Sequence, residues 1–262
     1  MKKMSTGKCK RSIFCGYSLK KVFSGLILMI FVFTLAGCKG SDYKKATGLF
    51  ESEDFSSAQE VFDTLGDYKD SKEKSKECLY QIAMQYYKDN DYKNAVAVLA
   101  EINDYDKATQ AIHTIVLKLI NDEYVPELTK TTQCYSTYLN SESKKFLTWV
   151  YGGMENDYEI DYSSYELKIL SAEKSILKDI TQKINNVFTA EILEKCDDSV
   201  KNVFEKFTAV DTSINKMYTV ENTFNLISGN KLNGSTGDMV SVDECTSLVS
   251  KLENALKELK SD

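Results

Sequence analysis

The chain has 262 residues, of which 42% are apolar and 27% are charged, with 12 Gly and a single Pro. This composition is typical of a folded protein, and it excludes a collagen-like chain, a disordered tail and a polytopic membrane protein. Proline breaks helix interiors, so one proline in 262 positions favours long uninterrupted helices.

The first 37 residues carry seven basic side chains and no acidic one, and they include a 15-residue apolar run from Val22 to Ala36. A basic segment followed by such a run is typical of a signal peptide, and the run is short for a helix that spans a bilayer. The run leads into Leu35-Ala36-Gly37-Cys38, directly before polar residues. This tetrapeptide resembles the lipobox of bacterial lipoproteins. The alternative is an uncleaved signal anchor with an incidental cysteine.

The lipobox resemblance implies a processed and lipid-anchored protein. Signal peptidase would remove residues 1–37 as a lipoprotein signal peptide after the Cys38 thiol has received a diacylglycerol. The new amino group of Cys38 can then take a further acyl chain. We therefore expect lipid attachment at Cys38, a position on the extracytoplasmic face of the cell membrane, and no cofactor apart from this covalent lipid.

The part of the chain that follows residue 37 is acidic, with 26 Lys against 39 Asp and Glu and a formal charge of −13. Arg11 is the only arginine and lies in the signal segment, so the mature chain has no guanidinium for bidentate phosphate or guanine contacts. An acidic surface also repels phosphate backbones. We therefore expect no nucleic-acid partner, and attachment to the membrane through acyl chains rather than a basic patch.

Four further cysteines remain in the mature chain. They are Cys78, Cys134, Cys196 and Cys245. In an exported protein they can form two disulfides in any of three pairings. No C-x-x-C pair occurs, so we expect no zinc site and no other metal site. Each cysteine stands among apolar neighbours at helical spacing, which favours buried free thiols. Both interpretations of their redox state are open from the sequence.

Residues 43 to 108 contain an internal repeat, which appears when the sequence is shifted by 37 residues. The identical pairs are Tyr43 with Tyr80, Ala46 with Ala83, Asp54 with Asp91, Ala58 with Ala95, Asp67 with Asp104 and Tyr68 with Tyr105. In each unit an apolar stripe at helical spacing precedes an Asp-aromatic break, and a second stripe follows it. This pattern predicts a pair of helices in each unit.

The two units resemble the tetratricopeptide repeat, which places a small residue in its first helix and bulky, aromatic, small and bulky residues at fixed distances after it. The matching residues are Ala46, Leu49, Phe55, Ala58 and Phe62 in the first unit and Ala83, Tyr86, Tyr92, Ala95 and Leu99 in the second. The period of 37 instead of 34 and the missing tryptophan and terminal proline depart from the family. The connector Gly66–Ser71 is similar to that of tetratricopeptide-type repeats common in Gram-positive bacterial proteins.

Two such units leave an apolar face to cover, so we expect a capping helix from Tyr105 to Ile120 that ends within residues 121–126. The repeats and their capping helix are expected to occupy residues 38–125. The capping helix contains His113, the only histidine of the chain. Because no nucleophile motif or second histidine accompanies it, we expect a core or surface residue rather than a catalyst.

The family resemblance implies a groove lined by the first helix of each unit. The lining positions are Tyr43, Thr47, Phe50 and Glu51 around Ala46, and Tyr80, Met84, Tyr87 and Lys88 around Ala83. Rigid aromatic side chains anchor a peptide at low entropic cost, so one interpretation is that this aromatic wall holds a protein or peptide partner. The favoured interpretation is that the second half of the chain folds over the wall and uses it as core, because two repeats alone leave much surface to cover.

Residues 126–165 are expected to form one or two short helices, ending at Gly152-Gly153, and then a tyrosine-rich linker. The aromatic residues of this stretch either form a binding surface or pack between the two halves of the chain, and packing is the favoured interpretation. They are Trp149, Tyr151, Tyr158, Tyr162 and Tyr165.

Residues 166–262 contain three heptad seams of apolar residues, which start at Leu167, Val200 and Cys245. A flexible loop over residues 228–237 is expected between the second and third seams. Heptads of this length predict an antiparallel helical bundle, with an intermolecular coiled coil as the alternative.

These patterns predict an all-α protein in which tetratricopeptide-like helical hairpins are followed by a helical bundle. No hydrolase triad, nucleotide-binding loop or metalloprotease motif occurs, so we expect no enzyme. The leading hypothesis is a lipid-anchored extracytoplasmic interaction protein, a scaffold or adaptor that uses its repeats to hold a partner. The alternatives are a structural spacer without a ligand groove, and a solute-binding lipoprotein, although the two-lobed α/β pattern of such receptors is absent.

Overall fold

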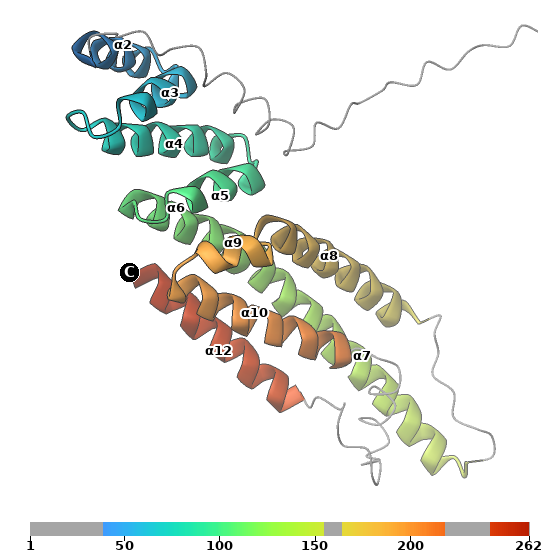
Figure 1. The fold of residues 1–262 in the computed structure, drawn as a ribbon. Helices are drawn as coiled ribbons and strands as arrows, with labels where there is room; N and C mark the ends of the chain where they lie inside the picture. The colour runs from blue at the N-terminus through green and yellow to red at the C-terminus, as the bar shows by residue number, and fades with distance from the viewer. Residues whose placement is uncertain (1–38, 155–163, 218–241, 262) are drawn as a thin grey trace, which may run out of the picture.

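The computed structural model describes residues 39–154, 164–217 and 242–261, and every regular element in these three ranges is a helix (Figure 1). The predicted all-α class is therefore confirmed. Three predictions fall outside the described residues: the signal peptide with Cys38, the tyrosine-rich linker at 155–163, and the loop at 228–237.

The repeat region folds into two consecutive helix pairs. The first pair is α2 (Lys39–Glu51) with α3 (Phe55–Leu65), and the second is α4 (Ser71–Lys88) with α5 (Tyr92–Glu101). Figure 1 shows these four helices stacked one on the next at one end of the molecule. The predicted helix pairs are present in both units.

The break inside each pair is built in the same way. Glu53 and Asn90, which are 37 residues apart, adopt positive φ angles of 62° and 60° that end the first helix. The next residue caps the second helix, because the Asp54 carboxylate accepts the Ser57 N–H at 3.3 Å and that of Asp91 accepts the Asn94 N–H at 3.2 Å.

The predicted small residues of the repeats are buried. Ala46 and Ala83 in the first helices and Ala58 and Ala95 in the second are fully inaccessible to solvent. Helices approach closely only where neither carries a large side chain, so these alanines fix the spacing within each pair. The larger residues of the pattern differ in burial. Phe62, Tyr92 and Leu99 are buried, and Leu49 and Phe55 are half-buried. Tyr86 is exposed, so the prediction of a core residue at this position is wrong.

The capping helix is longer than predicted. It begins as α6 (Asp106–Val116), continues as a π-helical segment, η1 (Leu117–Tyr124), and runs on into α7 (Val125–Tyr151). The prediction that residues 121–126 end the helix is wrong. In η1 the backbone widens, so that the Val125 N–H donates to the carbonyl of Ile120, and Pro126 lies in the first turn of α7. This widening shifts the hydrogen-bond register just before the proline, where its missing N–H and its ring would otherwise disrupt an α-helix.

One or two short helices were expected after residue 126, but the structure has a single long helix there, α7, of 27 residues. Neither Gly nor Pro occurs between Glu127 and Tyr151, so nothing in the sequence interrupts it. The helix ends at Gly152, as predicted, with the Gly152 N–H bonded to the carbonyl of Thr148.

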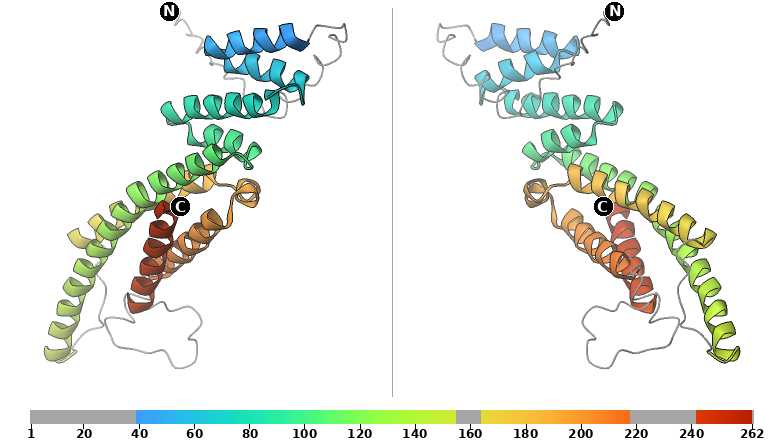
Figure 2. Two further views of the ribbon diagram at one scale, coloured as in Figure 1. Left: turned by 90° about the vertical axis from the view of Figure 1, so that its left-hand side faces the viewer. Right: turned by 90° about the vertical axis from the view of Figure 1, so that its right-hand side faces the viewer.

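The second half of the chain contains two helical hairpins. In one, α7 packs on α8 (Tyr165–Val187), and in the other α10 (Asp198–Met217) packs on α12 (Val242–Ser261), with the short α9 (Ala190–Lys195) between α8 and α10. Figure 2 shows the two hairpins diverging from the region of α6 and η1. The predicted bundle was confined to residues 166–262. The main packing partner of α8 is instead α7, which precedes this range.

The heptad seams face the interior of the molecule. Their buried members are Leu170, Leu177 and Ile184 on α8, Val200, Val203, Phe207, Val210 and Ile214 on α10, and Leu252, Leu256 and Leu259 on α12. These side chains join one hydrophobic cluster with the second repeat unit and η1. The seams are thus occupied within the chain, and an intermolecular coiled coil is not needed to bury them.

Candidate interaction surface

The eight predicted groove residues lie on α2 and α4, the first helices of the two units, and we call this set the wall. Glu51 and Lys88 are exposed. The other six are half-buried: Tyr43, Thr47, Phe50, Tyr80, Met84 and Tyr87. The wall of aromatic side chains is therefore present, but its members are partly engaged with their surroundings.

In the first unit, Tyr43 is held by the connector between α3 and α4. Its ring packs edge-on against Phe62 and Tyr68, with ring centroids 5.8 and 6.0 Å apart. Its hydroxyl donates to the carboxylate of Asp70 at 2.5 Å, which lowers the pKa of Asp70 and raises the pKa of Tyr43. The ammonium of Lys69 lies 4.2 Å from the centre of the Tyr43 ring.

In the second unit, Tyr80 makes the equivalent ring contact. Its ring packs edge-on against Tyr105 at 6.2 Å, and Lys107 lies over both rings. Burial would raise the pKa of the neighbouring Glu77, but hydrogen bonds from Lys107 and the Tyr105 hydroxyl lower it below its usual value. Tyr80 and Tyr105 each lie 37 residues after Tyr43 and Tyr68. The contact between the two tyrosine rings therefore repeats with the period of the sequence.

A second pair of rings follows the same period. Phe50 packs edge-on against Phe55 with centroids 5.3 Å apart, and Tyr87 packs against Tyr92 at 5.7 Å. Each of these contacts joins the end of the first helix to the start of the second. Phe50 and Tyr87 of the wall therefore also help to hold the two helices of each pair together.

The described helices of the second half of the chain make their main contacts away from the wall. Among the described residues, α2 packs on α3, and α4 packs on α3 and α5, whereas α8, α9 and α12 make their substantial contacts to the first half at α5 and η1. The expectation that the second half folds over the wall is therefore wrong for the described helices. The capping helix continues through η1 into α7. The helices α8 and α12 contact this continuation rather than α2 or α4.

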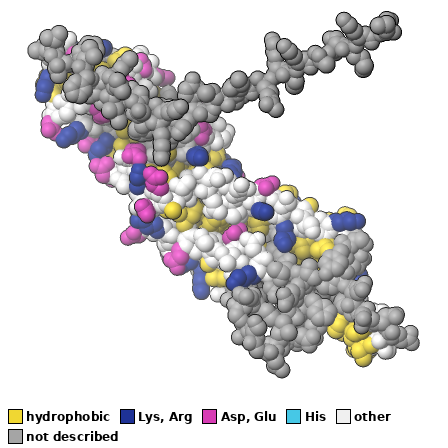
Figure 3. Space-filling view, turned by 45° about the vertical axis from the view of Figure 1, so that its right-hand side comes forward, with side chains coloured by type: hydrophobic (Ala, Val, Ile, Leu, Met, Phe, Trp, Pro, Cys, Tyr) yellow, Lys and Arg dark blue, Asp and Glu magenta, His cyan; other side chains and the backbone are white. Residues whose placement is uncertain are grey.

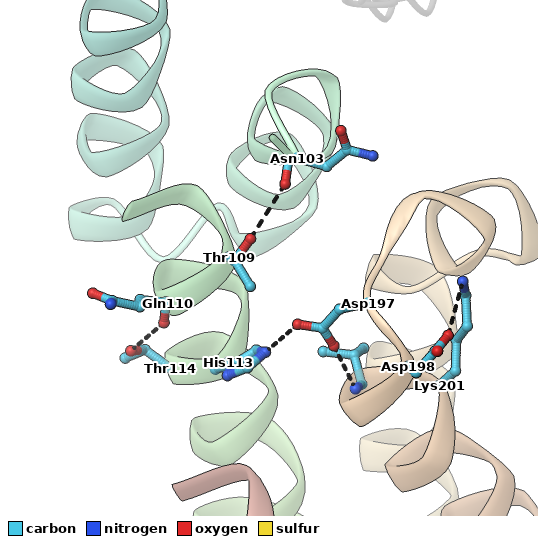
Figure 4. Close-up of polar contacts among 9 residues, drawn as sticks. Asn103, Thr109, Gln110, His113, Thr114, Asp197, Asp198 and Lys201 are labelled. Atoms are coloured by element: carbon cyan, nitrogen blue, oxygen red, sulfur yellow. Dashed lines mark hydrogen bonds and ion pairs between the residues drawn. The ribbon is translucent and has the colours of Figure 1, made fainter. Parts of the chain in front are cut away.

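His113 connects the repeats to the second half of the chain (Figure 4). Its side chain is largely buried on α6, and its Nε2 atom lies 2.6 Å from Oδ2 of Asp197. The other oxygen of Asp197 accepts the N–H of Val200 at 2.8 Å and so caps the start of α10. His113 is therefore buried, which is one of the two locations expected from the sequence.

A hollow of about 350 Å³ lies beside this contact, between the α5–α6 connection and the segment from α9 to α10. The side-chain amide of Asn103 donates to the carbonyl of Lys195 at 3.0 Å, and the Lys195 ammonium pairs with Glu101. Polar contacts thus hold α9 to the end of the second unit.

The cysteines at three of the four positions are free thiols. They are Cys78, Cys134 and Cys196. Burial raises the pKa of both the Cys78 and Cys196 thiols to about 11, so neither carries a reactive thiolate near neutral pH. Free thiols, rather than disulfides, are therefore found among these three. The side chain of Cys245 lies outside the described residues.

Exposed apolar side chains gather at the far end of the α7–α8 hairpin. Tyr151 is 84% exposed and Tyr165 is 75% exposed, and Leu147 and Met154 are also exposed. In Figure 3 hydrophobic side chains are visible at this end of the molecule. The expectation that these tyrosines pack between the two halves is wrong, because α7 carries them away from the repeats. Trp149 is half-buried and contacts the ring of Phe146.

Within the described ranges, no helix is both long and apolar enough to cross a bilayer, and no group of three metal-ligating side chains occurs. Comparison with known proteins found no significant match to a protein-family model, a curated protein or a solved structure.

Proposed function

We propose that this chain is a lipid-anchored protein on the extracytoplasmic face of the cell membrane, whose tetratricopeptide-like repeats hold a protein or peptide partner. The order of basic segment, apolar run and Leu35-Ala36-Gly37-Cys38 supports the anchor. The matched helix pairs and ring contacts at a spacing of 37 residues support the repeat assignment.

The observation that carries the partner site is the wall on α2 and α4, away from which the described helices of the second half make their main contacts. Its aromatic rings are fixed by their neighbours, and Met84 and Lys88 extend the same face of α4. Side chains that are already ordered lose little conformational entropy when a partner binds. A face with rigid aromatic rings, one flexible thioether and charges at its edge suits an extended or helical peptide segment.

Site-specific cross-linking in the intact lipoprotein tests this proposal. A photoreactive phenylalanine analogue replaces Met84 or Lys88 on the wall, and Glu60, which is exposed on α3, provides the control position. We expect irradiation of cell envelopes to give the same discrete adduct from positions 84 and 88 and none from position 60. The adduct from position 84 should disappear when Lys88→Glu reverses the charge beside it.

A structural spacer is the second candidate, and one observation favours it. Each ring of the wall already has an aromatic neighbour within the repeats, as Tyr80 has in Tyr105 and Tyr87 in Tyr92. The stacked units followed by α7 also give the molecule an elongated form (Figure 1). If positions 60, 84 and 88 give no adduct while the protein remains membrane-anchored, the spacer function replaces the partner-binding function.

A further inference from the structure

The outer face of α2 ends the stack of repeat helices. Its exposed residues recur at helical spacing along one side of the helix. We call this set the α2 outer face: Ser41, Lys44, Lys45, Gly48 and Ser52. It contains no apolar side chain, although the opposite side of α2 packs on α3 through Ala46.

Comparison with the second unit shows why this face is polar. Cys78 on α4 is fully buried in the cluster with Ala58 and Phe62 of α3. The equivalent residue 37 positions earlier is Ser41, which is exposed. Terminal helices of stacked repeats need a polar outer surface because no further unit covers them.

The α2 outer face is flat and positively charged. A Cβ atom at Gly48 would meet nothing within 4 Å, and the serines add only short side chains. Lys44 and Lys45 are exposed there, and Lys39 is exposed at the start of the helix. The nearby acids of α2 are Glu51, which is exposed at the edge of the face, and Asp42, which is half-buried. Asp67, in the connector between α3 and α4, interacts electrostatically with Lys39, so the positive charge of the face is due to Lys44 and Lys45. These two lysines contrast with the charge of −13 on the chain after residue 37.

The position of α2 next to the expected anchor decides what this face meets. The helix begins at Lys39, the residue directly after Cys38, so no linker separates it from the lipid. In Figure 1 α2 lies across the end of the stack. A lipid on Cys38 therefore holds one end of this flat face at the membrane.

We propose that the α2 outer face rests on the bilayer surface and binds anionic phospholipid headgroups through Lys44 and Lys45. The repeats then stack outward from the membrane, and the α7–α8 and α10–α12 hairpins lie farther from it. This inference rests on the proposed attachment of lipid at Cys38. It adds a specific electrostatic contact to an anchor that otherwise acts through its acyl chains alone.

Vesicle binding tests the contact independently of how the cell processes Cys38. Residues 38–262, which contain every described helix, are joined to a myristoyl thioester by ligation at the amino-terminal cysteine, a reaction that internal cysteines do not undergo. A single chain of this length binds membranes weakly and reversibly, so changes in the protein contact remain measurable. The two vesicle preparations are pure phosphatidylcholine and a mixture of phosphatidylcholine with phosphatidylglycerol.

We expect Lys44→Gln with Lys45→Gln to lower the partition coefficient on the phosphatidylglycerol vesicles by about fivefold for each lysine, and to leave partition on pure phosphatidylcholine unchanged. The matched control is Lys88→Gln with Lys93→Gln, which removes the same charge from exposed positions on α4 and at the start of α5. Equal losses for both double variants, or no loss for either, would overturn the proposal.

A second measurement reports the orientation of the molecule. A fluorescent amino acid replaces Gly48 on the α2 outer face or Leu147 near the end of α7, and the vesicles contain a headgroup spin label as quencher. We expect strong quenching at position 48 and none at position 147. Equal quenching at the two positions would contradict a flat contact through α2. Failure of Cys38 lipidation in cells would instead disprove the proposed anchor and would not change either vesicle result.

Discussion

His113 on α6 and Asp197 before α10 lie 2.6 Å apart, Nε2 to Oδ2, and they are separated by 84 residues in the sequence. Asp197 also accepts the N–H of Val200, so one carboxylate both contacts the repeat region and caps a helix of the second half. This capping residue is therefore one of the contacts that join the two parts of the molecule.

This double role predicts a difference between two substitutions. Asp197→Ala removes the cap and the contact to His113, and we expect it to lower the free energy of unfolding by about 1–2 kcal/mol. Asp197→Asn retains capping ability and should cost clearly less. Urea denaturation of both variants gives the comparison, and equal losses would show that the cap contributes little.

The repeat equivalence predicts matching costs at matching positions. Ala46 and Ala83 are fully buried at the same place in the two units, so Ala46→Leu and Ala83→Leu each overpack a helix contact. We expect each to lower the free energy of unfolding by about 1–3 kcal/mol. Lys44→Leu, on the exposed side of α2, serves as the control. Tolerance of leucine at one alanine but not at the other would contradict the equivalence.

Asp211 on α10 gives a prediction about pH. Burial raises the pKa of Asp211 above its usual value, although a hydrogen bond from Thr181 at 3.0 Å opposes this. A carboxyl with a raised folded-state pKa favours folding below its unfolded-state pKa, and this contribution is lost as pH rises through the raised pKa. The charged form is therefore the unfavourable one at neutral pH.

Replacing Asp211 with Asn removes the buried charge and keeps an acceptor for Thr181. We expect Asp211→Asn to raise Tm at pH 7 and to lose this advantage as the pH falls below the usual range of an aspartate pKa. Asp179→Asn, at an exposed position on α8, should change Tm little at either pH. A lower Tm for Asp211→Asn at pH 7 would mean that the charged carboxylate stabilises the fold.

The cysteines should differ in reactivity. Cys78 and Cys196 are buried with pKa values of about 11, whereas Cys134 is only half-buried. We expect an alkylating reagent at pH 7.5 to modify Cys134 before Cys78 and Cys196 in the folded protein, and these three cysteines at similar rates in urea. Mass spectrometry of the digested protein gives the three rates. Rapid modification of Cys196 in the folded state would show that α9 opens readily.

The sequence predicts the repeat units well because their signals are local. Alanine spacing, the acid at each helix start and the aromatic residues all lie within one period, as Asp54 and Asp91 illustrate. The continuous helix across Pro126 was not predictable in this way. A proline usually ends a helix, whereas here it follows a π-helical segment whose last residue, Tyr124, is buried against Phe207 with ring centroids 4.8 Å apart. A contact between residues so far apart in the sequence gives no local signal.

The partners of the long helices were also not predictable. A heptad seam shows which side of a helix is buried but not which helix covers it, so the pairing of α8 with α7 needed the structure. The degree of burial of the wall was not predictable from the repeat pattern either. The pattern gives the positions of Tyr80 and Tyr87 on α4, but it does not show that the rings of Tyr105 and Tyr92 pack against them.

The lipid anchor is the central claim, and detergent phase partition of the full-length chain with Cys38→Ala tests it most directly. We predict that the unchanged protein enters the detergent phase and that the variant moves to the aqueous phase, because the acyl chains on Cys38 provide the apolar attachment. Cys134→Ala should remain in the detergent phase. If the Cys38→Ala protein partitions like the unchanged one, the protein is not anchored by lipid at this residue.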